Sequence, residues 1–186
     1  MALLSQERIV HTAKEIVRTE GHARLSVRGL ARQLDVTAPA IYDHIESKDA
    51  VLRAVAGAGY DELRAAYSTT ADSAIERMRE RALVYVEFAR TNPELFTLMF
   101  MFRPNAIAIE ADNELSAATD VFESGVDDVR QAVADGQLVD RDPVQLTLTL
   151  WAAIHGVATV SIVAPSVAEA VAADVIDAML AGLRPT

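Results

Sequence analysis

The chain has 186 residues, of which 51% are hydrophobic, so it is long enough to bury one large core or two small ones. It contains no cysteine, which excludes disulfides and thiolate metal sites and fits a reducing compartment. The formal net charge of -10 argues against a general affinity for nucleic acid.

This negative charge is unevenly distributed along the chain. Residues 1–50 hold seven Lys/Arg and seven Asp/Glu, whereas residues 51–186 hold ten and twenty. This distribution fits an N-terminal DNA-binding domain, the head, that carries no net charge. The acidic remainder, the body, would be repelled by DNA phosphates. The first residues also lack the long apolar core of a signal peptide, which predicts a cytoplasmic protein.

The first two predicted helices carry hydrophobic stripes that recur every three to four positions. One covers residues 6–20 and stops at Gly21. The other covers residues 27–34, with Ser26 as its N-cap and Asp35 in the left-handed conformation that ends many helices. The residues expected inside this N-terminal domain are Ile9, Ala13, Ile16, Val17, Val27, Leu30, Ala31, Leu34, Val36, Ile41 and Ile45.

A tight turn separates the second helix from a third at about residues 38–45. Thr37 would cap this helix, and Pro39 falls in its first turn, where the missing N–H costs nothing. Its outward side holds Tyr42, Asp43 and His44. Two helices joined by a turn of about three residues, the second with an exposed polar and aromatic face, constitute a helix-turn-helix.

The stretch from Ile9 to Leu52 resembles the DNA-binding domain of the tetracycline-repressor-like (TetR) family of regulators. The matching features are Gly21, the Leu30-Ala31 pair, the Val36-Thr37 turn, residues 41–44 and the Ser47-Lys48-Asp49 run. The resemblance implies that the third helix enters the major groove of double-stranded DNA, at one half-site of a palindromic operator. It also implies two sets of DNA-binding residues: Thr37, Tyr42, His44 and Lys48 for phosphates, and Ala38, Pro39 and Ala40 nearest to the bases.

The sequence leaves three points open. Arg28, at the start of the second helix, is either a DNA contact or a solvated side chain. Without the resemblance, Tyr42, His44 and Lys48 would be ordinary residues of an exposed helix face. Asp43 departs from the neutral or aromatic residue usual in the family, which leaves the operator sequence undetermined.

The rest of the chain predicts six more helices, at about residues 47–67, 71–90, 93–102, 111–136, 143–164 and 166–183. Arg103-Pro104 would close the sixth helix, and a loop at 105–110 would follow it. The expected fold is all-α, with about nine helices: a three-helix helix-turn-helix head on a C-terminal helical bundle. The expected domains are residues 1–48 for DNA binding and residues 49–186 for ligand binding and dimerisation.

The eighth helix has no Asp, Glu, Lys or Arg between Val144 and Ala164. That length would span a bilayer. Its six polar side chains, its Asp-Pro start and the lack of a basic flank argue against a membrane span. Alternation at residues 147–150 fits a strand, but the length of the segment favours a helix. A helix that is apolar nearly all round needs cover on every side. We therefore expect the eighth and ninth helices to form the interface of a homodimer, with Val157 and Val160 facing the partner.

The resemblance extends into the C-terminal part. The run from Trp151 to Gly156 is similar to the Trp-x-x-x-His-Gly signature of one class of ligand-binding domain in these regulators, and residues 93–96 resemble what precedes it. Aromatic and Met side chains make adaptable apolar linings. The candidate ligand-binding residues are Phe96, Met99, Phe100, Trp151 and His155, with His155 as the polar anchor. The competing interpretation is that the Met-Phe residues are simply core, and that His155 is a core or interface histidine.

Enzymatic functions find little support. The four histidines show no metal-ligand spacing, and the chain has no Gly-rich phosphate loop or nucleophile elbow. The paired acids Asp127-Asp128 and Glu76/Glu80 are expected on solvated helix faces. The sequence therefore predicts a dimeric, cofactor-free transcriptional repressor that a small, largely apolar effector releases from its operator. The alternative is a helical ligand-binding or protein-interaction module without operator binding.

Overall fold

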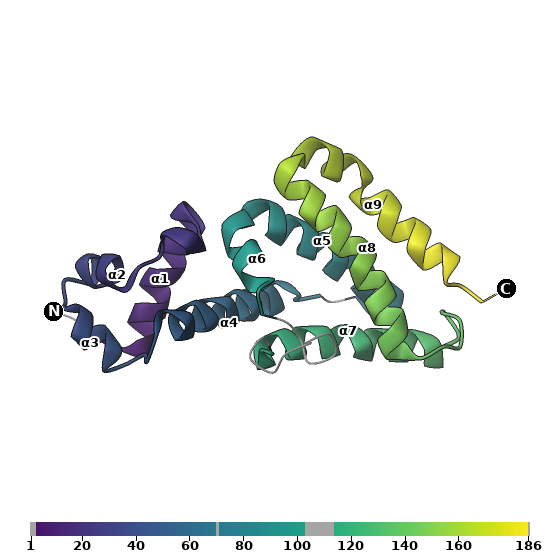
Figure 1. Cartoon of the computed structure of the whole chain (residues 1–186). Helices are drawn as coiled ribbons and strands as arrows, with labels where there is room; N and C mark the ends of the chain where they lie inside the picture. Colours follow the sequence, from purple (N-terminus) through teal and green to yellow (C-terminus); the bar gives the residue numbers. More distant parts are fainter. Residues whose placement is uncertain (1–2, 70, 103–113, 186) are drawn as a thin grey trace. The chain divides into compact units, whose positions relative to one another are not determined.

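The computed structural model describes residues 3–69, 71–102 and 114–185 (Figure 1). These residues form nine α-helices and one short 3-10 helix, which confirms the all-α fold expected from the sequence. The elements are α1 (Gln6–Glu20), η1 (His22–Arg24), α2 (Val27–Leu34), α3 (Ala38–Tyr42), α4 (Lys48–Ala66), α5 (Ala74–Thr91), α6 (Pro93–Met99), α7 (Ser116–Ala134), α8 (Pro143–Val163) and α9 (Pro165–Gly182).

The helices group into two compact units. Unit 1 comprises Met1–Glu62 and Asn92–Thr119, and unit 2 comprises Leu63–Thr91 and Asp120–Thr186. The division falls within α4 and α7, and it places α6 in the same unit as the helix-turn-helix. These units are defined by contacts within the chain. The boundary expected after residue 48 separates DNA binding from ligand binding and dimerisation, and it stays a prediction.

Local signals set the ends of the first two helices as predicted. α1 ends at Gly21, whose φ of 83° lies in the region that favours glycine. The Ser26 hydroxyl accepts a hydrogen bond from the Gly29 N–H at 3.1 Å, which caps α2. Asp35 then adopts φ 56° and ψ 46°, the left-handed conformation expected at the end of this helix.

The third helix is shorter than predicted. α3 ends at Tyr42, whereas the sequence predicted a helix to about residue 45. Ile41 and Ile45 are both buried, and the N–H groups of His44 and Ile45 both bond to the carbonyl of Ile41 at 3.0 Å. A tight turn after Tyr42 therefore brings both isoleucines into the core. Thr37 stands at the N-cap position, but its side chain makes no capping hydrogen bond, so that part of the prediction is wrong.

The interior of unit 1 holds the residues that the stripes predicted, except that Val27 and Val36 are only half-buried. α1 packs against α2, η1 and α6, and α2 packs against α3. Glu62 of α4 forms ion pairs with Lys14 and Arg18 of α1. These ion pairs join α4 to α1 at Glu62.

α4 and α6 also pack closely within unit 1. A Cβ atom at Gly59 would lie 2.7 Å from Sδ of Met99, so glycine permits this approach. The Tyr60 hydroxyl lies 3.1 Å from the carbonyl oxygen of Met99 and 2.9 Å from that of Phe102. It thus supplies a donor to carbonyls at the C-terminal end of α6, which ends at Met99, before the position predicted. The predicted Arg103-Pro104 stop and the loop at 105–110 lie outside the described residues.

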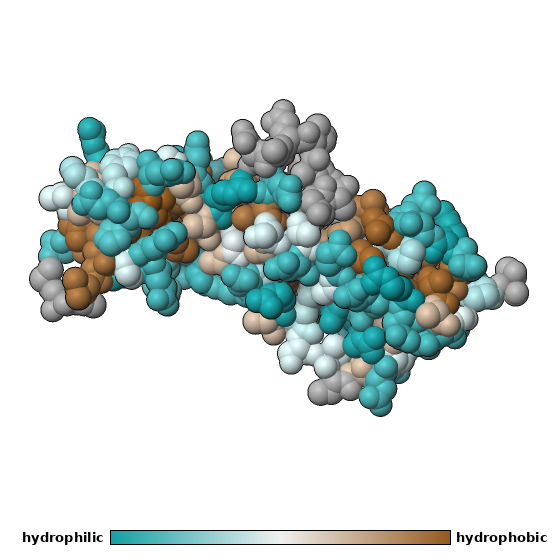
Figure 2. All heavy atoms as spheres, turned by 90° about the horizontal axis from the view of Figure 1, so that it is seen from below, coloured by the Kyte–Doolittle hydropathy of each residue, from teal (hydrophilic) through white to brown (hydrophobic). Residues whose placement is uncertain are grey.

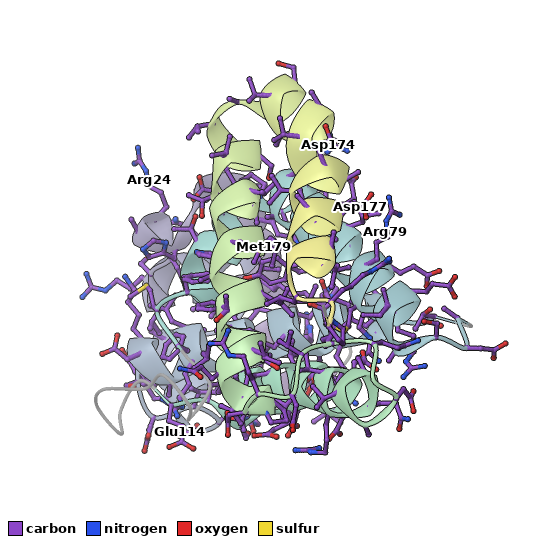
Figure 3. The ribbon with its side chains drawn as sticks, turned by 90° about the vertical axis from the view of Figure 1, so that its right-hand side faces the viewer. Arg24, Arg79, Glu114, Asp174, Asp177 and Met179 are labelled. Carbon is purple, nitrogen blue, oxygen red and sulfur yellow. The ribbon has the colours of Figure 1, made fainter. Side chains whose placement is uncertain are left out.

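In unit 2, α8 packs against α5 and α9, and α5 also packs against α9. One buried cluster consists of Ala74, Val129, Ala132, Leu138 and Leu146. Figure 3 shows Arg79 of α5 and Asp177 of α9 pointing toward one another, with Nε of Arg79 2.7 Å from Oδ1 of Asp177. This ion pair lowers the pKa of the Asp177 carboxyl, chiefly through its hydrogen bond to Arg79.

A buried acid in unit 2 corrects one expectation. Asp127 is exposed, as predicted, but Asp128 is 5% exposed and pairs with two arginines of α5. Nε of Arg77 lies 2.9 Å from its Oδ1, and Nη1 of Arg81 bonds to its Oδ2. The second carboxylate of the Asp127-Asp128 pair is therefore a structural ion-pair centre between α5 and α7. A buried charge is tolerated there because two cations compensate it.

Within the described residues, α8 is the one helix long and apolar enough to cross a membrane, judged by length and composition only. It packs against α5 and α9 in unit 2, although only 28% of its apolar stretch is buried there. Thr147 and Ser161 are buried, and their hydroxyls bond to the carbonyls of Pro143 and Ala158. Side chains that satisfy their own helix backbone are compatible with an apolar protein interior.

Candidate nucleic-acid interface and effector site

The helix-turn-helix exposes a small polar and aromatic surface. Tyr42 is 51% exposed, so its ring and hydroxyl are available to a partner surface. Of the predicted DNA-binding residues, the exposed ones are Arg28, Thr37, Pro39, Tyr42 and His44, and the half-buried ones are Ala38, Ala40 and Lys48. All eight lie in unit 1, on α2, on α3 and its N-cap residue, in the turn after α3 and at the first residue of α4.

Lys48 occupies a helix end that does not favour a cation. Ser47 caps α4 through a 3.0 Å hydrogen bond from the Ala50 N–H to its hydroxyl, so Lys48 is the first residue of the helix. The positive end of the helix dipole lies at this terminus and disfavours a positive side chain. Its position is thus better explained by a negatively charged partner than by helix stability.

The predicted effector residues divide between the two units. Phe96, Met99 and Phe100 belong to unit 1, and Trp151 and His155 belong to unit 2. Phe96 is 3% exposed and Met99 is 1% exposed, and Met99 packs on Gly59. Phe100 is half-buried, with its ring 5.3 Å from that of Phe96. These contacts account for Phe96 and Met99 as core residues of unit 1, and their ligand role stays a prediction.

Trp151 and His155 form an aromatic cluster with Tyr85 of α5. The rings of Trp151 and His155 stack with centroids 5.3 Å apart and an interplanar angle of 16°. The Tyr85 hydroxyl lies 3.2 Å from Nδ1 of His155, and the Thr159 hydroxyl lies 3.4 Å from Nε2. Trp151 and His155 are half-buried, whereas Tyr85 is buried.

The hydroxyl contacts of His155 favour one tautomer. The Thr159 hydroxyl donates its proton to the carbonyl oxygen of His155 at 2.9 Å, so it is available to Nε2 as an acceptor. This arrangement favours the tautomer that carries its proton on Nε2, in which Nδ1 accepts from the Tyr85 hydroxyl. Burial lowers the pKa of His155 to about 4, so the ring is neutral at pH 7.

Sequence reasoning missed two residues of this cluster. Thr159 follows His155 by four residues on one helix, so helical spacing could have found it. Tyr85 lies 70 residues away, on a helix that the sequence does not pair with α8. Among the residues the structure covers, no three His, Asp or Glu side chains come together as a metal site would need.

Two family models match the chain. The model described as "Bacterial regulatory proteins, tetR family" matches residues 9–55, which include the helix-turn-helix. The model described as "Tetracyclin repressor-like, C-terminal domain" matches residues 78–183, which include Trp151 and His155.

Relatives and solved structures agree with these matches. The uncharacterised HTH-type transcriptional regulator YobS of Bacillus subtilis is 34% identical over 95 residues, which are 48% of this chain and 48% of that protein. A protein of unknown function from Rhodococcus sp. RHA1 has a TM-score of 0.83 at 25% identity, over 99% of this chain and 97% of that one. A TetR variant from Acinetobacter baumannii AYE in complex with minocycline has a TM-score of 0.73 at 19% identity, over 97% and 96%. The matched stretch spans 48% to 59% of the length of four curated relatives and 26% of the length of a fifth.

An N-terminal helix-turn-helix followed by an all-α body defines a class of helical regulatory proteins. Within that class, the chain belongs to the TetR family of bacterial regulatory proteins, as the residues around the helix-turn-helix predicted.

Proposed function

We propose that this protein is a DNA-binding transcriptional regulator that represses from a palindromic operator. The observation that carries the proposal is the exposed surface of α3 and the start of α4, with a half-exposed tyrosine and a lysine at an unfavourable helix end. α3 would enter the major groove, with Ala38, Pro39 and Ala40 next to the bases. Tyr42, His44 and Lys48 would bind phosphates, as would Thr37, whose hydroxyl makes no capping bond that would compete.

The test is operator binding by variants of Tyr42 and Lys48. Tyr42→Ala and Lys48→Ala should each weaken binding to a duplex from the chain's own upstream region, measured by fluorescence anisotropy. Lys48→Ala should also reduce the log–log salt slope by roughly one unit per lost phosphate contact. Arg184→Ala is the matched control, because Arg184 is an exposed cation beyond α9. Equal affinities for all four proteins would remove the proposed surface.

The competing function is a helical ligand-binding or interaction module whose head does not bind an operator. Its specific support is the acidic charge of the chain, which repels DNA outside a matched surface. Gel shifts separate the two functions. Wild-type protein that shifts no duplex from its upstream region, at salt concentrations low enough to favour association, would favour the module.

We also propose that the regulator is a cytoplasmic, non-enzymatic homodimer. Support for the dimer comes from the valines that α8 and α9 expose. Val160 is 39% exposed, Val163 79% and Val167 53%. Val157, expected to face the partner, is instead 8% exposed within unit 2, so it belongs to the core of the subunit.

The effector that we propose is small, largely apolar and uncharged where it meets α8. The stacked Trp151 and His155 rings offer a flat apolar surface, and a neutral imidazole favours neutral over cationic or anionic groups. A helical protein of the same fold holds minocycline, a comparison that supports a small-molecule site in the body. Trp151 is the single tryptophan, so a bound effector should change its fluorescence and weaken operator affinity. A compound that binds without either effect would place the site elsewhere.

A further inference from the structure

The proposed recognition segment is short of positive charge. Residues 37–47, which comprise α3, its N-cap and the turn into α4, include no Lys or Arg. They do include Asp43 and Glu46, and both are exposed. Phosphate neutralisation supplies most of the affinity of DNA-binding proteins, so the cations must come from neighbouring elements.

Of the sixteen Lys and Arg side chains that the structure describes, ten already interact with other groups of the protein, seven of them in ion pairs. In the part of the chain that the structure describes, six Lys or Arg side chains take part in no hydrogen bond or ion pair: Arg24, Arg28, Arg32, Lys48, Arg141 and Arg184. Four of these six fall between residues 24 and 48 of unit 1. The free positive charge is thus concentrated around the helix-turn-helix, although the chain as a whole is acidic.

Arg28 and Arg32 stand one turn apart on the exposed side of α2. Both are exposed, and Nη2 of Arg32 lies 4.0 Å from the position of a Cβ on Gly29, so the side chain runs back toward the first turn of α2. Like charges at this spacing destabilise a helix slightly, and α2 has no acidic residue that would offset them. The presence of Arg28 and Arg32 at this spacing is therefore better explained by a polyanion that binds both side chains than by the stability of α2.

Arg24 provides a contrast within the same unit. It is exposed and unpaired, but it lies on η1, which packs against α1 and α6. Arg28 and Arg32 lie on α2, which packs against α1 and α3. Figure 1 shows α2 and α3 on one side of α1 and α6 on the other, and Figure 3 shows the Arg24 side chain pointing into solvent. Of these three arginines, only Arg28 and Arg32 therefore lie on a helix that packs against α3.

We propose that Arg32, together with Arg28, binds the phosphate backbone beside the groove that α3 enters. In helix-turn-helix complexes the first helix of the motif crosses the backbone while the second reads the groove. Arg32 lies on that first helix and faces outward, and it compensates for the lack of cations in residues 37–47. The inference rests on the proposed function, and it adds a phosphate-binding residue to the operator contacts given above.

The salt dependence of binding tests this directly. With Arg28, Arg32 and Lys48 each on one phosphate, a dimer would neutralise about six phosphates, which predicts a log–log slope of about −5. Arg32→Ala removes about two of them per dimer, so the slope should flatten by roughly two units and the affinity at 0.1 M salt should fall about tenfold or more. Arg32→Lys keeps the charge and should keep the slope.

Two controls make the result specific. Arg24→Ala removes the same charge from the same unit and should leave slope and affinity unchanged. A duplex of scrambled sequence should show the same change in slope on Arg32→Ala, because a phosphate contact is independent of sequence. Thermal unfolding of each variant checks that the fold is retained.

The outcomes separate the two proposals. If wild-type protein binds its operator and Arg32→Ala has the same slope as Arg24→Ala, the role of Arg32 is overturned and the proposed function stands. An equal loss in Arg32→Ala and Arg24→Ala would mean that net charge alone is responsible, which also overturns it. If wild-type protein binds no duplex, both proposals fail.

Discussion

At the scale of single residues, burial keeps the His155 ring neutral. The Tyr85 hydroxyl lies 3.2 Å from Nδ1, and the Thr159 hydroxyl lies 3.4 Å from Nε2. The Tyr85 hydroxyl can rotate to accept a proton from Nδ1, so the hydrogen bonds do not by themselves oppose protonation. Desolvation of the ring is the cause of its lowered pKa.

The first prediction is a loss of stability between pH 6.5 and pH 4 that depends on His155. The unfolded ring has a pKa near its ordinary value of 6.5, and the folded ring has a pKa of about 4. The unfolded state therefore binds more protons in this window, so the free energy of unfolding falls as the pH falls through it. For a half-buried ring we expect about 1–2 kcal/mol of this loss at pH 5, measured by urea unfolding at several pH values.

The matched variant for this measurement is His155→Asn. Its side-chain oxygen can still accept from Tyr85, but the side chain does not titrate. Subtracting its pH profile from that of the wild type removes the carboxylate contribution common to both proteins. Parallel profiles for the two proteins between pH 7 and pH 4.5 would show that His155 is not desolvated in the folded state.

At the scale of elements, the crossing of α4 and α6 is set by Gly59. The side chains facing it, Met99 and Leu95, are both almost completely buried. A methyl group at this position would lie 2.7 Å from Met99 Sδ, 3.0 Å from Met99 Cγ and 3.3 Å from Leu95 Cδ1. The two helices can approach this closely only without a side chain at residue 59.

The second prediction compares two glycines of α4. Gly59→Ala should destabilise unit 1 by about 1–3 kcal/mol, because the buried neighbours have little space to move. Gly57→Ala places a methyl group where no atom lies within 4 Å, so it should stabilise the helix by up to about 1 kcal/mol. Urea unfolding of both variants measures the difference. Two variants of equal stability would mean that α4 and α6 do not cross as described.

The same elements show which parts of the fold follow from the sequence. The ends of α2 were predictable because Ser26 and Asp35 act on backbone groups within three or four residues. The end of α3 could not be predicted in this way, because it depends on the burial of Ile45 in a core formed by other helices. The burial of Asp128 was hidden for a similar reason: its two arginines lie 51 and 47 residues away.

The candidate site divides in the same way. Helical spacing correctly predicted the exposure of Tyr42, because the buried stripe of a short helix fixes its outer face. His44 is exposed as well, but in the turn after α3 and not on the predicted helix. Composition alone suggested that Phe96 and Met99 line a pocket, since the same side chains suit a pocket and a core. Which of the two they do depends on the helix that covers them, and the contact of Met99 with α4 was not visible in the sequence.

At the scale of the whole molecule, the acidic composition and the proposed DNA binding are compatible because ion pairs neutralise most cations outside the helix-turn-helix. In unit 2, Arg77 and Arg81 share Asp128, Arg79 pairs with Asp177, and Arg130 pairs with Asp127. Figure 2 shows one face of the molecule, on which hydrophilic side chains predominate and apolar ones form separate areas. An acidic body limits non-specific attraction to phosphates, so the orientation on DNA would be set by the cations near α3.

The last prediction concerns assembly through α8 and α9. Val160, Val163 and Val167 lie around the junction of these helices, and neither helix contains Lys or Arg. Val160→Asp would therefore place two carboxylates without cationic partners in a twofold interface. We expect wild-type protein at micromolar concentration to scatter light as a dimer, with twice the 20.1 kDa mass of the chain, and Val160→Asp as a monomer or an aggregate.

Val144→Asp is the matched control for this interface. Val144 is exposed to a similar extent, 38% against 39%, on the same helix. It lies 16 residues earlier, which at about 100° per residue turns it to nearly the opposite side of α8. The Val144→Asp variant should remain dimeric and keep its operator affinity. The Val160→Asp variant should lose most of that affinity, because a monomer has one helix-turn-helix and can occupy only one half-site. Wild-type protein that scatters as a monomer, or equal behaviour of the two variants, would rule out this face of α8 as the interface.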